Sequence, residues 1–316
     1  MLVMTLLCIA GAGLASAAFA PIFHRSSVVR LMMSSRLGSR PTITVPGLSR
    51  PPLLTSPPRT SPAPAAATAQ EPSLADQVTV AAEVTRAAQA VLPNMQVAFE
   101  IFDRTQGTVL ISQGGDRPFA AMSVVKLLIA LDALARDNSA IQGGLRQDLH
   151  QMLATSDDEI ADDLWTAGGG PAIVTRMVSL LGLTGARPPE DPGMWGDTLI
   201  TAQDMVTVYR YITDQLNQPE QDLILGALSD APKIAADGFN QYFGIPNGMP
   251  NTSWAVKQGW GTSGSQAVMN TTGLVGPGWR YVVVLLASAP ANSYSAAPAA
   301  VTAGAAELAN LVSATS

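Results

Sequence analysis

The sequence predicts an α/β (α+β) fold with two lobes, in which strands from both ends of the chain form a sheet beside an all-helical lobe. Strand-like segments lie early, at residues 96–112, and late, at residues 253–288, whereas helix-compatible segments fill the interval. The chain has 316 residues, of which 47% are hydrophobic. That is sufficient for one large domain with its own core, which we place at residues 74–316.

The composition excludes several classes of function. A formal net charge of −6 argues against binding to nucleic acid, whose phosphates need a basic surface. The two histidines are His24 and His150, so a histidine-rich metal site is excluded, and we expect neither metal nor cofactor. The one cysteine, Cys8, precedes the domain, which therefore has no disulfide framework. We expect a monomer.

The N-terminal segment has the composition of a membrane or export signal. Residues 2–23 carry no charge, and about 20 apolar residues are enough to cross a bilayer. We expect residues 1–24 to be a signal peptide or a membrane anchor, and Ala18-Phe19-Ala20 resembles a cleavage site. Cys8 lacks the small preceding residues of a lipidation signal. Arginines after the segment would favour a cytoplasmic C-terminal side by the positive-inside rule.

A linker is predicted between this segment and the domain. Residues 25–73 are rich in Pro, Ser, Thr and Ala and cannot bury a core, so we expect an extended, disordered tether. A plain spacer without further function fits equally well.

The periodicity of the domain predicts its elements in order. The helical segments, which include one buried helix from residue 120 and one uninterrupted helix over 143–165, are 74–91, 120–134, 143–165, 173–181, 202–215, 222–228 and 298–313. The strands are 96–102, 108–112, 253–259, 267–275 and 280–288. Residues 182–201 and 240–250 are expected to be irregular.

The chemistry is predicted on the buried helix. Ser123 and Lys126 are three residues apart, so on a helix they share a face and can touch. Apolar neighbours desolvate the lysine and lower its pKa, which allows a neutral amine to take a proton from the serine. An isolated Ser-x-x-Lys is usually a coincidence. Here, however, the chain has only three lysines, Lys126, Lys233 and Lys257, and places one inside an apolar helix.

Two further motifs follow in order. Ser156-Asp157-Asp158 lies in the segment 152–165, which is followed by three glycines and a proline at 168–171. Lys257-Gln258-Gly259 lies in a strand-like segment. With these motifs the chain resembles, over about residues 75–315, class A-type serine β-lactamases and penicillin-binding proteins of an actinobacterial type. The resemblance implies a five-stranded antiparallel sheet with two N-terminal and three C-terminal strands.

The resemblance also implies the roles of the site residues. Ser123 would be the nucleophile, Lys126 its base or the residue that orients the true base, and Ser156 the relay of a proton to the leaving nitrogen. Lys257 would attract the substrate carboxylate, although a lysine that protects a strand edge is the alternative. The main-chain N–H groups of Ser123 and Trp260 would form the oxyanion hole, and Asp158, Gln258 and Gly259 would contact substrate.

The irregular segment 182–201 resembles the omega loop of class A enzymes. In that family an Arg–Asp pair braces the loop, and Arg187 and Asp197 are the matching candidates. The loop also carries the family's deacylating glutamate, for which Glu190 is the candidate. A solvated loop carboxylate is an equally good interpretation of Glu190.

Two departures from the family pattern leave two functions open. Asp158 replaces an asparagine that both donates and accepts, and as an anion it would pair with a lysine and repel an anionic substrate. Gln258 replaces a hydroxyl residue. The first function is an extracytoplasmic, secreted or membrane-anchored serine hydrolase that acts on a β-lactam or a D-alanyl-D-alanine-like peptidoglycan peptide. The alternative is a catalytically weak or inactive protein of the same fold that binds cell-wall material.

Overall fold

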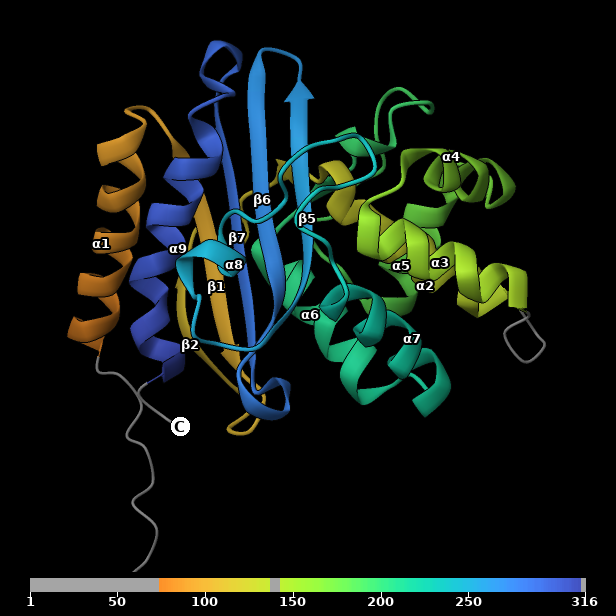
Figure 1. Cartoon of the computed structure of the whole chain (residues 1–316), viewed down its shortest axis with the longest axis horizontal. Helices are drawn as coiled ribbons and strands as arrows, with labels where there is room; N and C mark the ends of the chain where they lie inside the picture. Colours follow the sequence, from red (N-terminus) through yellow and green to blue (C-terminus); the bar gives the residue numbers. More distant parts are fainter. Residues whose placement is uncertain (1–73, 137–142, 314–316) are drawn as a thin grey trace, which may run out of the picture. The chain divides into compact units, whose positions relative to one another are not determined.

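The computed structural model describes residues 74–136 and 143–313, which belong to one folded unit (Figure 1). The predicted leader (1–24) and linker (25–73) lie outside the described residues. Within the described ranges, no helix is both long and apolar enough to cross a membrane.

One lobe is a five-stranded antiparallel sheet with the strand order β2-β1-β7-β6-β5. The strands are β1 (Gln96–Asp103), β2 (Thr108–Gln113), β5 (Trp254–Ser263), β6 (Gln266–Val275) and β7 (Tyr281–Pro290). β1 pairs with β7 along its whole length, so main-chain hydrogen bonds join the beginning of the domain to its end. The predicted sheet of two N-terminal and three C-terminal strands is confirmed.

β7 lies in the middle of the sheet and divides its side chains between two cores. Val282, Val284 and Leu286 belong to the core shared with the helical lobe. Val283 and Leu285 belong to the core beneath the outer helices. This division follows from the two-residue period of a strand and explains why β7 is apolar at nearly every position.

Helices cover both faces of the sheet. α1 (Leu74–Val91) and α9 (Ala297–Ser313) lie side by side over the outer face, as Figure 1 shows in orange and dark blue. α6 (Ala202–Asp214) packs against the inner face through buried residues such as Val208 and Tyr209. The second lobe lies beyond it and consists of α2 (Lys126–Arg136), α3 (Gly143–Thr155), α4 (Asp158–Ala167), α5 (Ala172–Leu181) and α7 (Gln218–Ser229).

The predicted single helix over residues 143–165 is wrong, because it is interrupted at Ser156. Ser156 has a positive φ of 59°, which a continuous helix does not contain. Asp157 then caps α4, since its side chain accepts hydrogen bonds from the main-chain N–H groups of Glu159 and Ile160. The interruption places Ser156 at a helix junction, where its side chain can face the sheet lobe.

Other helix boundaries differ from the predicted ones by a few residues. The helix predicted from residue 120 begins as a strand, β3 (Phe119–Ala120), and a 3-10 turn, η1 (Met122–Val125). α7 begins at Gln218, because Asn217 caps it and a proline occupies its first turn. The segment expected to be irregular contains α8 (Ile245–Gly248).

A buried carboxylate fastens the helical lobe. Asp132 on α2 is 1% exposed. It accepts hydrogen bonds from Nε and Nη2 of Arg176 at 2.6 and 2.9 Å, and from Nε of Arg136 at 2.7 Å. Arg176 also donates to the main-chain oxygen of Gly168 at 2.6 Å. Through Arg176, Asp132 therefore connects α2 to α5 and to the end of α4.

We expect Asp132→Ala to lower the free energy of unfolding by roughly 2 kcal/mol, because it empties a buried position and removes the acceptor that two guanidinium groups share. Urea denaturation measures this. Arg136→Ala is the matched control: Arg136 is 40% exposed, and removing a surface partner changes stability by less than about 1 kcal/mol. Equal effects of the two substitutions would contradict the role given to Asp132.

Candidate active site

The turn that carries Ser123 is clamped on both sides. Nδ2 of Asn270, on β6, donates to the main-chain oxygens of Ala120 and Ala121 at 2.9 and 3.1 Å. The N–H of Ala121 donates to the main-chain oxygen of Thr198 at 2.7 Å. Met122 then adopts a φ of +48°, which is uncommon for a residue with a side chain and tends to occur at functional sites.

Gly259 allows β5 to approach this turn. A Cβ atom at position 259 would lie 2.6 Å from the main-chain oxygen of Ala121 and 3.2 Å from Cβ of Met122. Only a residue without a side chain fits at that separation. The third motif therefore contains a glycine because the strand and the nucleophile turn are in direct contact.

The amine of Lys126 is fully buried and is surrounded by oxygens. Its Nζ lies 2.9 Å from Oγ of Ser123, 2.9 Å from the main-chain oxygen of Ser156 and 3.3 Å from Oγ of Ser156. It also contacts Oδ1 of Asp158. The ring of Trp195 covers it from another side, with its centroid 4.7 Å from Nζ.

The second lysine reaches the same place from the sheet. Lys257 on β5 is 1% exposed, and its Nζ donates to Oγ of Ser156 at 3.0 Å. It also donates to the main-chain oxygen of Gln258 at 3.2 Å. Ser156 thus lies between the two amines and connects them, while Lys126 connects Ser156 to Ser123.

Burial governs the protonation of both amines. It lowers the pKa of Lys126, and the carboxylates of Asp158, Asp157 and Asp237 partly oppose that effect. Burial also lowers the pKa of Lys257 well below its ordinary value, and the neighbouring charge of Lys126 adds to the decrease. Both amines are therefore closer to the neutral form at physiological pH than an exposed lysine is.

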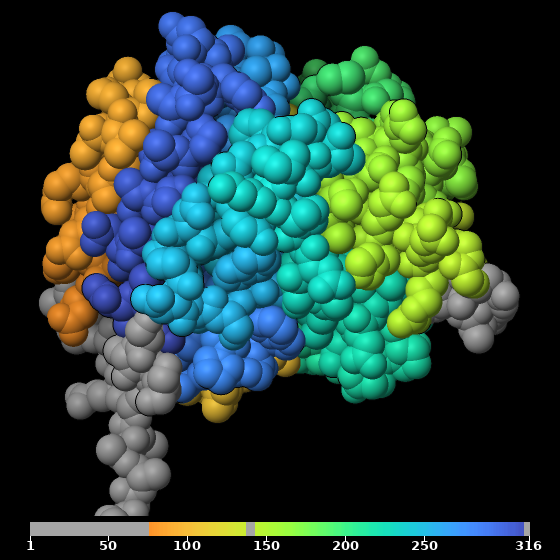
Figure 2. All heavy atoms as spheres, viewed as in Figure 1, coloured from red at the N-terminus to blue at the C-terminus, as the bar shows by residue number. Residues whose placement is uncertain are grey.

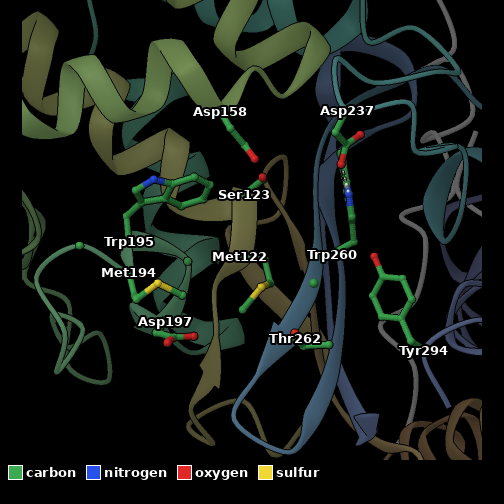
Figure 3. A pocket seen from close by; sticks show the side chains of 13 residues that line it. Met122, Ser123, Asp158, Met194, Trp195, Asp197, Asp237, Trp260, Thr262 and Tyr294 are labelled. Atoms are coloured by element: carbon green, nitrogen blue, oxygen red, sulfur yellow. Dashed lines mark hydrogen bonds between the residues drawn. The ribbon is translucent and has the colours of Figure 1, made fainter. Parts of the chain in front are cut away.

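A cavity of about 390 Å³ opens in front of Ser123 (Figure 3). Its wall contains three carboxylates, three aromatic rings and two thioethers. They belong to Asp158, Asp197, Asp237, Trp195, Trp260, Tyr294, Met122 and Met194. Ser123 and Asp158 point toward each other at its centre, and the two tryptophans lie on opposite sides.

Two hydrogen bonds position the tryptophans. Nε1 of Trp195 donates to Oδ1 of Asp162 at 2.7 Å, which holds the loop before Thr198 against α4. Nε1 of Trp260 donates to Oδ2 of Asp237 at 2.9 Å, and the ring stacks on Phe239 with centroids 4.9 Å apart. The opposite walls of the cavity are therefore each held by an indole.

The segment that contains Asp237 also seals the junction between the lobes. The N–H of Ala236 donates to the main-chain oxygen of Thr155 at 2.8 Å, and Nε2 of Gln241 donates to that of Ala154 at 3.1 Å. Figure 2 shows this segment in cyan, directly against the yellow-green atoms of the helical lobe. Because Gln241 also accepts a hydrogen bond from Gln258, this segment connects the end of α3 to the strand that carries Lys257.

The structure brings most of the predicted site residues together. Ser123, Lys126, Ser156 and Lys257 form one hydrogen-bonded chain, with Asp158 in contact with Lys126. Trp260 follows Gly259 on β5, the outer strand of the sheet, where alternate main-chain N–H groups have no partner strand. Their use as oxyanion donors stays a prediction.

Two predicted residues lie away from the cavity. Gln258 is fully buried with its side chain directed at the segment before α8, where Nε2 donates to the main-chain oxygens of Gln241 and Phe243 at 3.1 and 2.6 Å. A strand alternates its side chains, so Lys257 and Gln258 point in opposite directions. Glu190 is exposed and does not line the cavity.

The predicted pairing of Arg187 with Asp197 is wrong. Nη1 of Arg187 donates instead to the main-chain oxygens of Thr184 and Ala186 at 3.0 and 2.7 Å. Main-chain bonds of 3.0 and 2.9 Å between Arg187 and Leu199 close the loop in place of the ion pair. Among the described residues, Oδ1 of Asp197 is buried and has no hydrogen-bond partner.

Sequence reasoning did not identify Asp237, Trp195 or Tyr294 as parts of the site. Asp237 and Tyr294 lie in connections without a motif, and each is at least 20 positions away from every residue of the three motifs. Trp195 carried one usable signal, because a large aromatic residue in a Gly- and Pro-rich loop is normally anchored on a neighbouring element.

Comparison with known proteins gives one curated group of relatives. The chain is 33% identical over 215 residues to "Putative lipoprotein LppW" of Mycobacterium tuberculosis and of Mycobacterium bovis. The aligned region covers 66% of this chain and 68% of the relative. No protein-family model matches the sequence.

Solved structures with the same fold include class A β-lactamases and PBP-A. A PBP-A mutant, solved as its acyl-enzyme complex with penicillin G, superposes with a TM-score of 0.60, 17% identity and coverage of 74% of this chain and 96% of that one. The class A β-lactamase of Mycobacterium abscessus superposes with a TM-score of 0.59 and 17% identity, and the match covers 74% of this chain and 98% of that one. The predicted β-lactamase-like fold is thereby confirmed.

We expect Gly259→Ala to lower the free energy of unfolding by roughly 1 to 3 kcal/mol, because its methyl group would force β5 away from the nucleophile turn. Thermal or urea denaturation measures this. Gly226→Ala on α7 is the matched control, since a Cβ atom there meets nothing within 4 Å and the helix gains up to about 1 kcal/mol. If Gly259→Ala were as stable as the control, the close contact would be disproved.

Proposed function

From the premise that this chain belongs to the family of the mycobacterial LppW proteins and has the fold of class A β-lactamases, we propose that it is a serine hydrolase. It forms an acyl-enzyme on Ser123 with a β-lactam or a D-alanyl-D-alanine-like amide. The observation that carries this proposal is the hydrogen-bonded chain from Ser123 through Lys126 and Ser156 to Lys257.

The surroundings of Lys126 suit a general base. The main-chain oxygen of Ser156 and the carboxylate of Asp158 can only accept hydrogen bonds. A neutral amine has two N–H groups, which match these two acceptors, and its lone pair is then left for the hydroxyl of Ser123. Loss of that proton lets Oγ attack the carbonyl carbon, and Lys126 becomes the ammonium.

Ser156 and Lys257 complete the acylation step. As the C–N bond breaks, Oγ of Ser156 gives its proton to the leaving nitrogen and takes one from the ammonium of Lys126, 3.3 Å away. The amine of Lys257 holds Oγ of Ser156 in place at 3.0 Å. The N–H groups of Ser123 and Trp260 stabilise the oxyanion, a contribution of about 100- to 1000-fold in rate per donor.

Deacylation is the slower half of the proposed cycle. Hydrolysis of the ester needs a base that activates water, and Glu190 is exposed rather than directed at the cavity. We therefore propose that acylation exceeds turnover and that the acyl-enzyme accumulates.

A second candidate function rests on Asp158. Its contact with Lys126 also suits an ammonium, which cannot act as a base. In that case the domain would bind cell-wall material without cleaving it.

The proposed place of action is the cell envelope. The relatives carry the word lipoprotein in their name, and residues 2–23 of this chain contain no charge. Membrane fractionation of the full chain, with and without residues 1–24, tests this location.

We expect incubation with a fluorescent penicillin to add the mass of the intact penicillin to the protein, as read by intact-mass spectrometry. The adduct should be lost in Ser123→Ala and retained in Ser179→Ala, whose hydroxyl lies on the surface of α5. Rapid hydrolysis without an adduct would identify an efficient β-lactamase. Neither adduct nor hydrolysis would refute the hydrolase and favour the binding protein.

We expect Asp158→Asn to speed acylation at neutral pH. The carboxylate raises the pKa of Lys126, so its removal lowers that pKa further and increases the neutral fraction of the base. Acylation requires the neutral amine and is lost as the pH falls through the pKa of Lys126, so the rate profile should move to lower pH. Asp163→Asn is the matched control on an exposed turn of α4. Equal or slower labelling of Asp158→Asn would contradict this account.

A further inference from the structure

The charged side chains that line the cavity are all carboxylates. Asp158, Asp197 and Asp237 lie on three different walls, contributed by α4, by the loop before Thr198 and by the segment before α8 (Figure 3). No lysine or arginine of the described residues lines this cavity. The two lysines of the site are 0% and 1% exposed and are not among the residues that line the cavity.

The charges of these carboxylates reach the reacting centre. Asp158 contacts Lys126 directly. The carboxylate of Asp237 acts on both Lys126 and Lys257, since it raises the pKa of each against the effect of burial. With both pKa values lowered overall, the amines neutralise at most part of the negative charge.

The three carboxylates of the wall are acceptors only. At position 158 a carboxylate can accept a hydrogen bond from a substrate but cannot donate one to a carbonyl. Asp197 adds a further carboxylate to the wall, and its Oδ1 has no hydrogen-bond partner among the described residues. Trp195, Trp260 and Tyr294 add aromatic rings, whose faces attract cations.

We propose that, among the substrates of the proposed function, the cavity favours those whose acyl side chain carries a positively charged amine over those whose side chain carries a further carboxylate. The proposal deepens the proposed function, because it names the substrate class of the same site. A substrate carboxylate would meet three like charges, whereas an ammonium would meet three opposite charges and aromatic rings.

Three penicillins that differ only at the α-carbon of the side chain test this selection. Benzylpenicillin carries hydrogen there, ampicillin an ammonium at about pH 6.5, and carbenicillin a carboxylate. We expect the second-order rate constant of acylation to fall in the order ampicillin, benzylpenicillin, carbenicillin, by roughly fivefold or more per charge at low salt. Concentrated salt should reduce these ratios.

Replacing individual aspartates of the wall by asparagine tests whether their charges cause the substrate preference. Asp197→Asn and Asp237→Asn should each reduce the preference for ampicillin over carbenicillin by roughly threefold. The asparagine oxygen at 237 can still accept from Nε1 of Trp260, so the wall keeps its geometry. Asp116→Asn, at an exposed position away from the cavity, is the matched control and should leave the ratio unchanged.

Binding to Ser123→Ala separates this proposal from the proposed function. Quenching of tryptophan fluorescence reports occupancy, because Trp195 and Trp260 line the cavity. If the same order of affinity is found while the wild-type protein forms no adduct, the charge selection holds and the hydrolase does not. If carbenicillin binds or acylates best, if charge has no effect, or if no compound binds Ser123→Ala, the selection is overturned.

Discussion

Burial of two amines at one point between the lobes is the constraint on which the rest of this site depends. Lys126 comes from a helix and Lys257 from a strand 131 positions later, and both are desolvated. Such burial is tolerated only when each N–H finds an acceptor, and the acceptors come from Ser156, Asp158 and main-chain oxygens. The helix break at Ser156, with its positive φ, supplies them. A strained residue of the helical lobe therefore supplies acceptors both to an amine of its own lobe and to an amine of the sheet.

The same constraint explains why the sheet and the helical lobe are fastened so closely. Gly259 brings β5 against the nucleophile turn, and Asn270 binds the two residues before Met122. Gln258, on the opposite side of the strand, holds the segment before α8. These contacts position the strand of Lys257 and the turn of Ser123 relative to each other, so residues of the scaffold also determine the geometry of the site.

The parts of the site that could be predicted are those encoded locally. The spacing of Ser123 and Lys126 within an apolar segment, together with the rarity of lysine in the chain, is enough to indicate a desolvated pair. Asp237 and Trp195 could not be found this way, because their role depends on which loops fold over the cavity. The direction of the Gln258 side chain was missed for a different reason. Successive side chains of β5 point to opposite faces of the sheet, and matching a sequence motif does not take this alternation into account. The helix break at Ser156 was missed although Asp157 carried a capping signal.

The pairing of β1 with β7 has a consequence for how this protein is made. β1 lies between β2 and a strand that begins at Tyr281, so the sheet stays divided until that strand, 178 positions after the end of β1 at Asp103, has left the ribosome. The helical lobe, by contrast, consists of neighbours in sequence and can assemble early. A nascent chain would thus expose two apolar strands for most of its synthesis, which makes it a natural client for holding chaperones.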